Sequence, residues 1–122
     1  MKIAITAQGK ELSSEIDLRF GRAKWIIVVV VDSETGDFTA YDNVVNLNAT
    51  QGAGIQTGQN IANTGVEAVI TGNIGPNAFK TLNATGVKIF LAETQTVQQA
   101  LDSFKAGKLK EVNGANVEGH WI

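Results

Sequence analysis

The sequence predicts an α/β protein with three layers, α/β/α, built around one mixed sheet of about five strands. The first observation is a weak internal repeat, because ANTGVEAVI at 62–70 resembles NATGVKIFL at 83–91. Each copy has the pattern of a helix end, a glycine stop and a strand start, which is typical of consecutive β-α-β units with parallel strands. The second observation is a hairpin pattern in the first half of the chain, which adds antiparallel strands to the same sheet.

Three strands are expected in the first half. Residues 2–7, KIAITA, predict a short strand, and residues 25–31, WIIVVVV, predict a central strand because they are apolar throughout and mostly β-branched. Residues 38–44, FTAYDNV, alternate between apolar and polar side chains, which indicates the returning strand of a hairpin. The stretch 8–16 is long and polar without a clear period, so we expect a mobile loop from there to residue 22.

Three helices and two strands are expected in the second half. The helices are predicted at 55–65, 76–86 and 96–107, and the strands at 66–71 and 87–92. Each predicted helix ends in a glycine, the residue that most readily terminates a helix. Pro76 suits a first helical position, and Thr96 with Gln99 forms a capping box. The sequence after residue 107 has no clear period.

Composition excludes several classes of protein. A chain of 122 residues with 43% hydrophobic and 18% charged residues is typical of one globular domain, which we expect to span residues 1–122. A formal net charge of −2 favours neither nucleic acid nor a membrane as partner. No apolar run reaches the ~18 residues of a membrane span, and the polar start is unlike a signal peptide, so we expect a cytoplasmic protein. Without cysteine, the chain has no thiolate ligands for a metal.

The segment VITGNIGPNAF at 69–79 predicts a strand-to-helix corner at the carboxyl end of a parallel strand. Ligands of wound sheets bind at such ends. The glycines let the backbone turn and approach a ligand closely, and a helix starting at Pro76 presents free N–H groups to an anion. The residues of this corner that we expect at a ligand are Gly72, Asn73, Gly75 and Asn77.

A second corner is predicted at QGAG, residues 51–54, where Gly52 and Gly54 precede the first helix of the second half. The glycines of GAGIQTG are spaced GxGxxxG, which does not match the dinucleotide-binding pattern GxGxxG. Two helix starts facing one cavity would form an anion site. The alternative for both corners is turn geometry alone, because tight β-α turns need glycine in any wound fold.

A basic loop adds positive charge. DLRFGRAKW at 17–25 contains both arginines of the chain, Arg19 and Arg22, together with Lys24. The alternative is a solvated loop whose charges keep a sheet edge soluble. The lone histidine, His120, can serve as one metal ligand among several or be an ordinary residue of the tail.

Four motifs stand in the order and spacing of one family. They are RFGRA at 19–23, GAG at 52–54, VITGNIGPNAF at 69–79 and TGVKIF at 85–90. The chain resembles the dinitrogenase iron–molybdenum cofactor biosynthesis family, which includes orange-protein-like carriers of a molybdenum–copper sulfide cluster. The resemblance implies a ribonuclease H-like α/β/α fold. Many members are expected to have histidine or cysteine near the site, whereas Gln51 and Asn73 occupy the two corners here, which argues against direct metal coordination by them.

The resemblance implies a binding protein, not an enzyme, for an anionic metal–sulfur cluster that contains molybdenum with iron or copper. Its role would be carriage, storage or protection during cofactor assembly, with cofactor-assembly or redox proteins as partners. Two alternatives stay open: an enzyme or sensor for a small phosphorylated ligand at the same corners, and an interaction module without a ligand. One histidine and no cysteine give no nucleophilic triad, and the strand at 2–7 lacks the carboxylates of metal-dependent nucleases.

Overall fold

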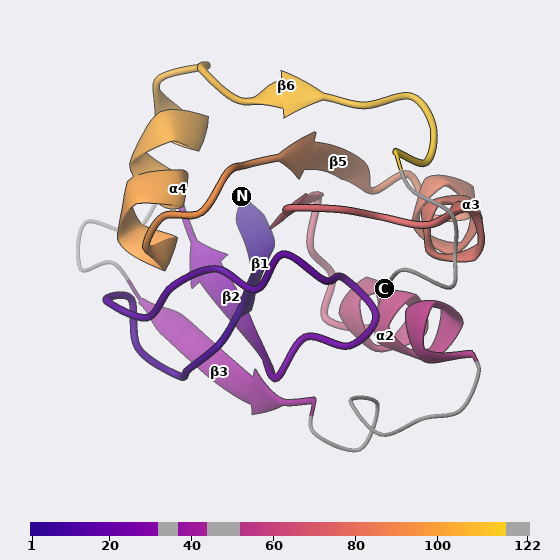
Figure 1. Cartoon of the computed structure of the whole chain (residues 1–122), viewed down its shortest axis with the longest axis horizontal. Coiled ribbons are helices and arrows are strands. Elements are labelled where there is room, and N and C mark those ends of the chain that lie inside the picture. Colours follow the sequence, from indigo (N-terminus) through magenta and orange to yellow (C-terminus); the bar gives the residue numbers. More distant parts are fainter. Residues whose placement is uncertain (32–36, 44–51, 117–122) are drawn as a thin grey trace.

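The structure is a computed structural model that describes residues 1–31, 37–43 and 52–116. It contains one six-stranded sheet in the order β3-β2-β1-β4-β5-β6 (Figure 1). The strands are β1 (Lys2–Ala7), β2 (Trp25–Val30), β3 (Phe38–Asp42), β4 (Ala68–Thr71), β5 (Lys88–Leu91) and β6 (Lys110–Glu111). The helices are α2 (Ala53–Ala62), α3 (Pro76–Ala84) and α4 (Val97–Lys105).

The sheet is mixed, as the sequence predicts. Strands β1, β4 and β5 run parallel to one another, whereas β2 pairs antiparallel with both β1 and β3. This arrangement confirms the ribonuclease H-like α/β/α fold. The strand count differs by one, because β6 pairs antiparallel with β5 through only two residues, Lys110 and Glu111. Both are exposed and polar, so no apolar alternation marks them in the sequence.

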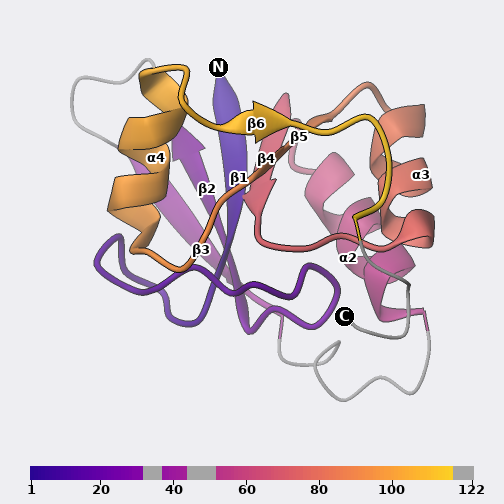
Figure 2. The same ribbon diagram turned by 45° about the horizontal axis from the view of Figure 1, so that its top comes forward.

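Helices cover both faces of the sheet. Figure 2 shows α4 on one side and α2 and α3 on the other. Along β1, Ala4 belongs to the core under α2 and α3, whereas its neighbours Ile3 and Ile5 belong to the core under α4. Because successive side chains of a strand point to opposite faces, a central strand with apolar residues on both sides is buried by both layers.

The predicted helix ends are largely confirmed. Thr96 and Gln99 form the expected capping box, in which the Gln99 N–H donates to Thr96 Oγ1 at 3.1 Å and the Thr96 N–H donates to Gln99 Oε1 at 2.9 Å. Helix α2 starts at Ala53, two residues earlier than predicted, and its N-cap residue Gly52 adopts the left-handed conformation. Among the described residues, no helix has the length and apolar character needed to cross a membrane.

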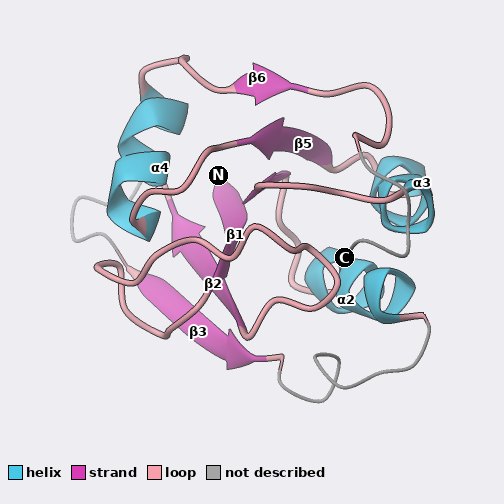
Figure 3. Ribbon diagram, viewed as in Figure 1, coloured by secondary structure: helices cyan, strands magenta, loops and turns pink. Residues whose placement is uncertain are grey.

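The loop between β1 and β2, drawn in pink in Figure 3, is hydrogen-bonded to the residues around the start of α4. The Ile16 N–H donates to Gln95 O at 2.9 Å, and the Val97 N–H donates to Ser14 O at 2.8 Å. Ile16 and Phe20 are completely buried. Main-chain hydrogen bonds and two buried apolar side chains attach the loop, and neither leaves a periodic signal in the sequence. The mobility of the loop stays a prediction.

Candidate anion-binding site

The basic loop lies directly against the corner that follows β4. Arg19 forms a parallel bridge with Asn73, and the Asn73 Nδ2 donates to Leu18 O at 3.1 Å. A Cβ atom on Gly72 would lie 2.8 Å from the Cα atom of Leu18, closer than such atoms pack in proteins. Glycine at position 72 is therefore required for the loop to dock on this corner.

The same loop also lies on the first turn of α2. A Cβ atom on Gly21 would lie 2.7 Å from the Gly54 nitrogen, and one on Gly54 would lie 3.2 Å from Ala78 Cβ at the start of α3. Thr57 fixes this contact, because its hydroxyl donates to Gly21 O at 2.9 Å. The motifs RFGRA, GAG and GPNAF, which are far apart in the sequence, therefore meet at one place in the structure.

Glycine is the N-cap residue of both helices that start at this place, Gly52 for α2 and Gly75 for α3. Within the described residues neither N-cap contributes a side-chain hydrogen bond, and neither first turn has an acidic residue. Gly52 and Asn77 are exposed. Because the first N–H groups of a helix carry partial positive charge, two adjacent starts of this kind can bind an anion.

The three basic residues of the loop differ in exposure. Lys24 is exposed and Arg22 is partly buried. The Arg19 side chain is 43% exposed, and its Nε lies 3.5 Å from Oδ1 of the buried Asp17. The loop therefore presents positive charge beside the helix starts, on a chain whose formal net charge is −2.

Asn116 completes the corner and was missed by sequence reasoning. Its Oδ1 accepts from the Ile74 N–H at 2.6 Å, its N–H donates to Ile74 O at 3.1 Å, and its Nδ2 donates to Asn73 Oδ1 at 3.0 Å. No sequence signal could have found it, because its partners lie 42 and 43 positions away along the chain. The Asn73 amide therefore links the loop to the tail instead of pointing freely at a ligand.

The metal-ligand predictions are only partly covered by the structure. Gln51 and the predicted ligand His120 lie outside the described residues. Within the described ranges, no group of three or more His, Cys, Asp or Glu residues could hold a metal ion.

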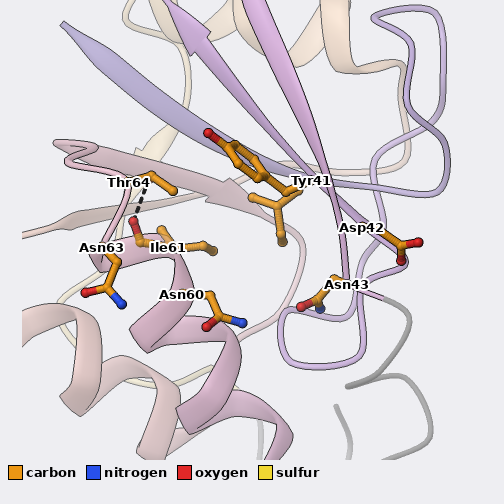
Figure 4. A pocket seen from close by; sticks show the side chains of 8 residues that line it. Tyr41, Asp42, Asn43, Asn60, Ile61, Asn63 and Thr64 are labelled. Carbon is orange, nitrogen blue, oxygen red and sulfur yellow. Dashed lines mark hydrogen bonds between the residues drawn. The ribbon is translucent and has the colours of Figure 1, made fainter.

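Two pockets lie elsewhere on the molecule. One, of about 260 Å³, lies between β2, β3 and the carboxyl-terminal half of α2; Figure 4 shows Tyr41 on β3 facing Ile61, with Asn60 beside it. The other, of about 300 Å³, lies between α3, β5 and the segment that contains β6. Neither pocket is lined by a predicted site residue, so the candidate anion site stays at the junction of the basic loop with the two helix starts.

Known proteins that are similar in sequence and structure cover nearly the whole chain, including the motifs that meet at this junction. An uncharacterized protein of Methanocaldococcus jannaschii is 32% identical over 112 residues, which is 91% of each chain. The apo form of the orange protein from Desulfovibrio gigas superposes with a TM-score of 0.89 at 38% identity, covering 95% of this chain and 96% of that one. A NifB candidate from Thermotoga superposes with a TM-score of 0.81 at 39% identity, covering 97% and 98%.

The family match includes all four motifs. The model of the dinitrogenase iron–molybdenum cofactor family matches residues 1–107, which include the basic loop, both glycine corners and every helix of the described chain. The chain therefore belongs to the dinitrogenase iron–molybdenum cofactor family.

Proposed function

We propose that this protein binds an anionic metal–sulfur cluster, or a precursor of one, and carries, stores or protects it during cofactor assembly without catalysing a reaction itself. The observation that carries the proposal is the junction of the basic loop with two helix starts that contain no acidic residue. Membership of a family named for the iron–molybdenum cofactor supports the class of cargo. Cofactor-assembly or redox proteins would deliver and receive it.

The cargo would be held by charge and by N–H donors. Clusters of molybdenum with iron or copper bring their own sulfides, which suits a chain without cysteine. Backbone N–H groups at the helix starts and the cations of the loop would donate charge-assisted hydrogen bonds to those sulfides. Gly54 and Gly72 would act through shape, because they let the loop approach the helices. Asn73 would also act through shape, because its amide holds the loop on the corner. The assigned residues are Arg19, Arg22, Lys24, Gly52, Gly54, Gly72, Asn73, Gly75 and Asn77.

His120 is assigned as one protein ligand of the cargo metal. Asn116 is hydrogen-bonded to Asn73 and Ile74 at the corner, so its backbone position beside the site is fixed. His120 follows four residues later, and four residues span at most about 14 Å. That reach includes the corner, and imidazole is a common metal ligand.

Reconstitution with tetrathiomolybdate tests the proposal. Protein prepared without air is incubated with the anion, with and without copper(I), and uptake is measured by visible absorption and metal stoichiometry. Each arginine is expected to contribute about 1–3 kcal/mol to the free energy of cluster binding. This is the range of hydrogen bonds to charged groups, and its lower end applies to exposed side chains. Arg19→Ala with Arg22→Ala should therefore weaken retention at least tenfold and reduce its dependence on salt.

A matched control removes two other cations. Lys108→Ala with Lys110→Ala changes the net charge equally at exposed positions outside the site, and should leave retention unchanged. Equal retention in the arginine variant and the wild type would contradict electrostatic holding. Absence of uptake together with a phosphate-dependent rise in melting temperature would favour the phosphorylated-ligand alternative.

A further inference from the structure

Asp17 is a buried carboxylate at the base of the basic loop. Its side chain is 4% exposed. Its backbone N–H donates to Thr6 O at 2.8 Å, and its carbonyl accepts from Thr6 Oγ1 at 2.7 Å. These two bonds join Asp17 to β1, so its carboxylate has a fixed position relative to the sheet.

The carboxylate of Asp17 holds the two ends of the loop together. Oδ1 accepts from the Arg19 N–H at 3.0 Å, and Oδ2 accepts from the Lys24 N–H at 3.3 Å. A buried carboxylate is costly unless it is hydrogen-bonded, and here donors from both sides of the loop satisfy it. Asp17 therefore sets the shape of the segment that carries all three cations.

Asp17 also contacts one edge of the Arg19 guanidinium. Its Oδ1 lies 3.5 Å from Arg19 Nε, and within the described residues the two Nη groups of Arg19 have no hydrogen-bond partner. A guanidinium is planar and carries five donors in a rigid fork. A carboxylate at the Nε edge therefore leaves the Nη edge available for a second anion.

We propose that Asp17 is a positioning residue for cargo binding: it holds the Nε edge of Arg19 so that the Nη edge faces the cargo. This inference rests on the proposed function, because the second anion is the cluster. It also opposes the simplest electrostatic expectation. A negative charge beside the site repels an anion, so charge alone predicts tighter binding when Asp17 is neutralised.

The test is a double-mutant cycle with tetrathiomolybdate and copper(I) as the probe. Asp17→Asn should weaken retention about tenfold, although it removes a repelling charge. In the Arg19→Ala background, Asp17→Asn should cause a clearly smaller loss than in the wild type, because Asp17 acts mainly through Arg19. Asp102→Asn, the same chemical change at an exposed carboxylate of α4, should have no effect.

A second measurement needs no variant. The Arg19 Nε–H resonance of the wild type without cargo should exchange slowly with solvent, because Asp17 holds that group. Fast exchange would overturn the inference even if Asp17→Asn does not fold. Two other results would overturn the inference while leaving the proposed function intact. One is tighter cluster retention in Asp17→Asn. The other is a loss of retention from Asp17→Asn that is equally large in the wild type and in Arg19→Ala. A wild type that takes up no cluster would contradict the proposed function itself.

Discussion

Single glycines decide whether the candidate site can form. Gly21 and Gly72 are the positions where the basic loop lies against α2 and against the corner after β4, and neither place has room for a side chain. The two alternatives in the sequence, a turn or a ligand site, are therefore not exclusive. The glycines serve packing, and this packing brings Arg19 beside the helix starts.

Gly72→Ala tests this role. A methyl group 2.8 Å from Leu18 Cα forces the loop to shift, so we expect the free energy of unfolding to fall by about 1–3 kcal/mol and cluster retention to fall with it. Gly114→Ala is the control, because no heavy atom of the described residues lies within 4 Å of its added Cβ. Its unfolding free energy should change by less than about 0.5 kcal/mol. Urea denaturation of both variants measures the difference, and equal stabilities would contradict the packing argument.

At the scale of elements, the capping of helix α3 and the binding of an anion at its start can be tested separately. Its N-cap, Gly75, has φ −86° and ψ 173°, a conformation that Asp and Asn adopt at helix N-caps. A capping side chain there would satisfy the N–H groups that we assign to the cargo. Substitutions at Gly75 therefore test whether those N–H groups are needed to bind the anion.

Gly75→Asp and Gly75→Asn form a matched pair. Both add a side chain of nearly the same volume at a buried position, so they share any packing cost, and either side chain can cap the helix. Gly75→Asp should lose tetrathiomolybdate retention at least tenfold because its carboxylate repels the anion, whereas Gly75→Asn should lose clearly less. Absorption titrations beside thermal melts separate the two effects. Similar retention in both variants would remove α3 from the site.

The elements also show where sequence reasoning succeeds. The capping box of Thr96 and Gln99 was predictable because its partners are three residues apart, and the helix at Pro76 because proline and the following apolar stripe are local signals. Strand β6 and Asn116 were not predictable, because their partners lie far away in the sequence and their own residues are polar. The motifs of the site could be recognised singly, but their meeting point depends on contacts between distant glycines.

For the whole molecule, charge and topology together explain how an acidic chain can hold an anion. The formal net charge of −2 belongs to the chain as a whole, whereas the basic loop is held beside two helix starts by bonds to β1, α2 and the corner after β4. A loop that is fixed before cargo arrives loses little conformational entropy on binding. The attachment of the loop should therefore be detectable in the protein without cargo.

Amide hydrogen exchange of the cargo-free protein tests this attachment. The N–H groups of Ile16 and Asp17 donate to Gln95 O and Thr6 O at 2.9 and 2.8 Å, so they should exchange as slowly as amides of the central strands. Ser13 is the internal comparison, because it is exposed and its N–H has no hydrogen-bond partner among the described residues; it should exchange near the rate of an unfolded peptide. Fast exchange at all three positions would mean that the loop is mobile before binding, and the cargo would then have to supply the free energy that orders it.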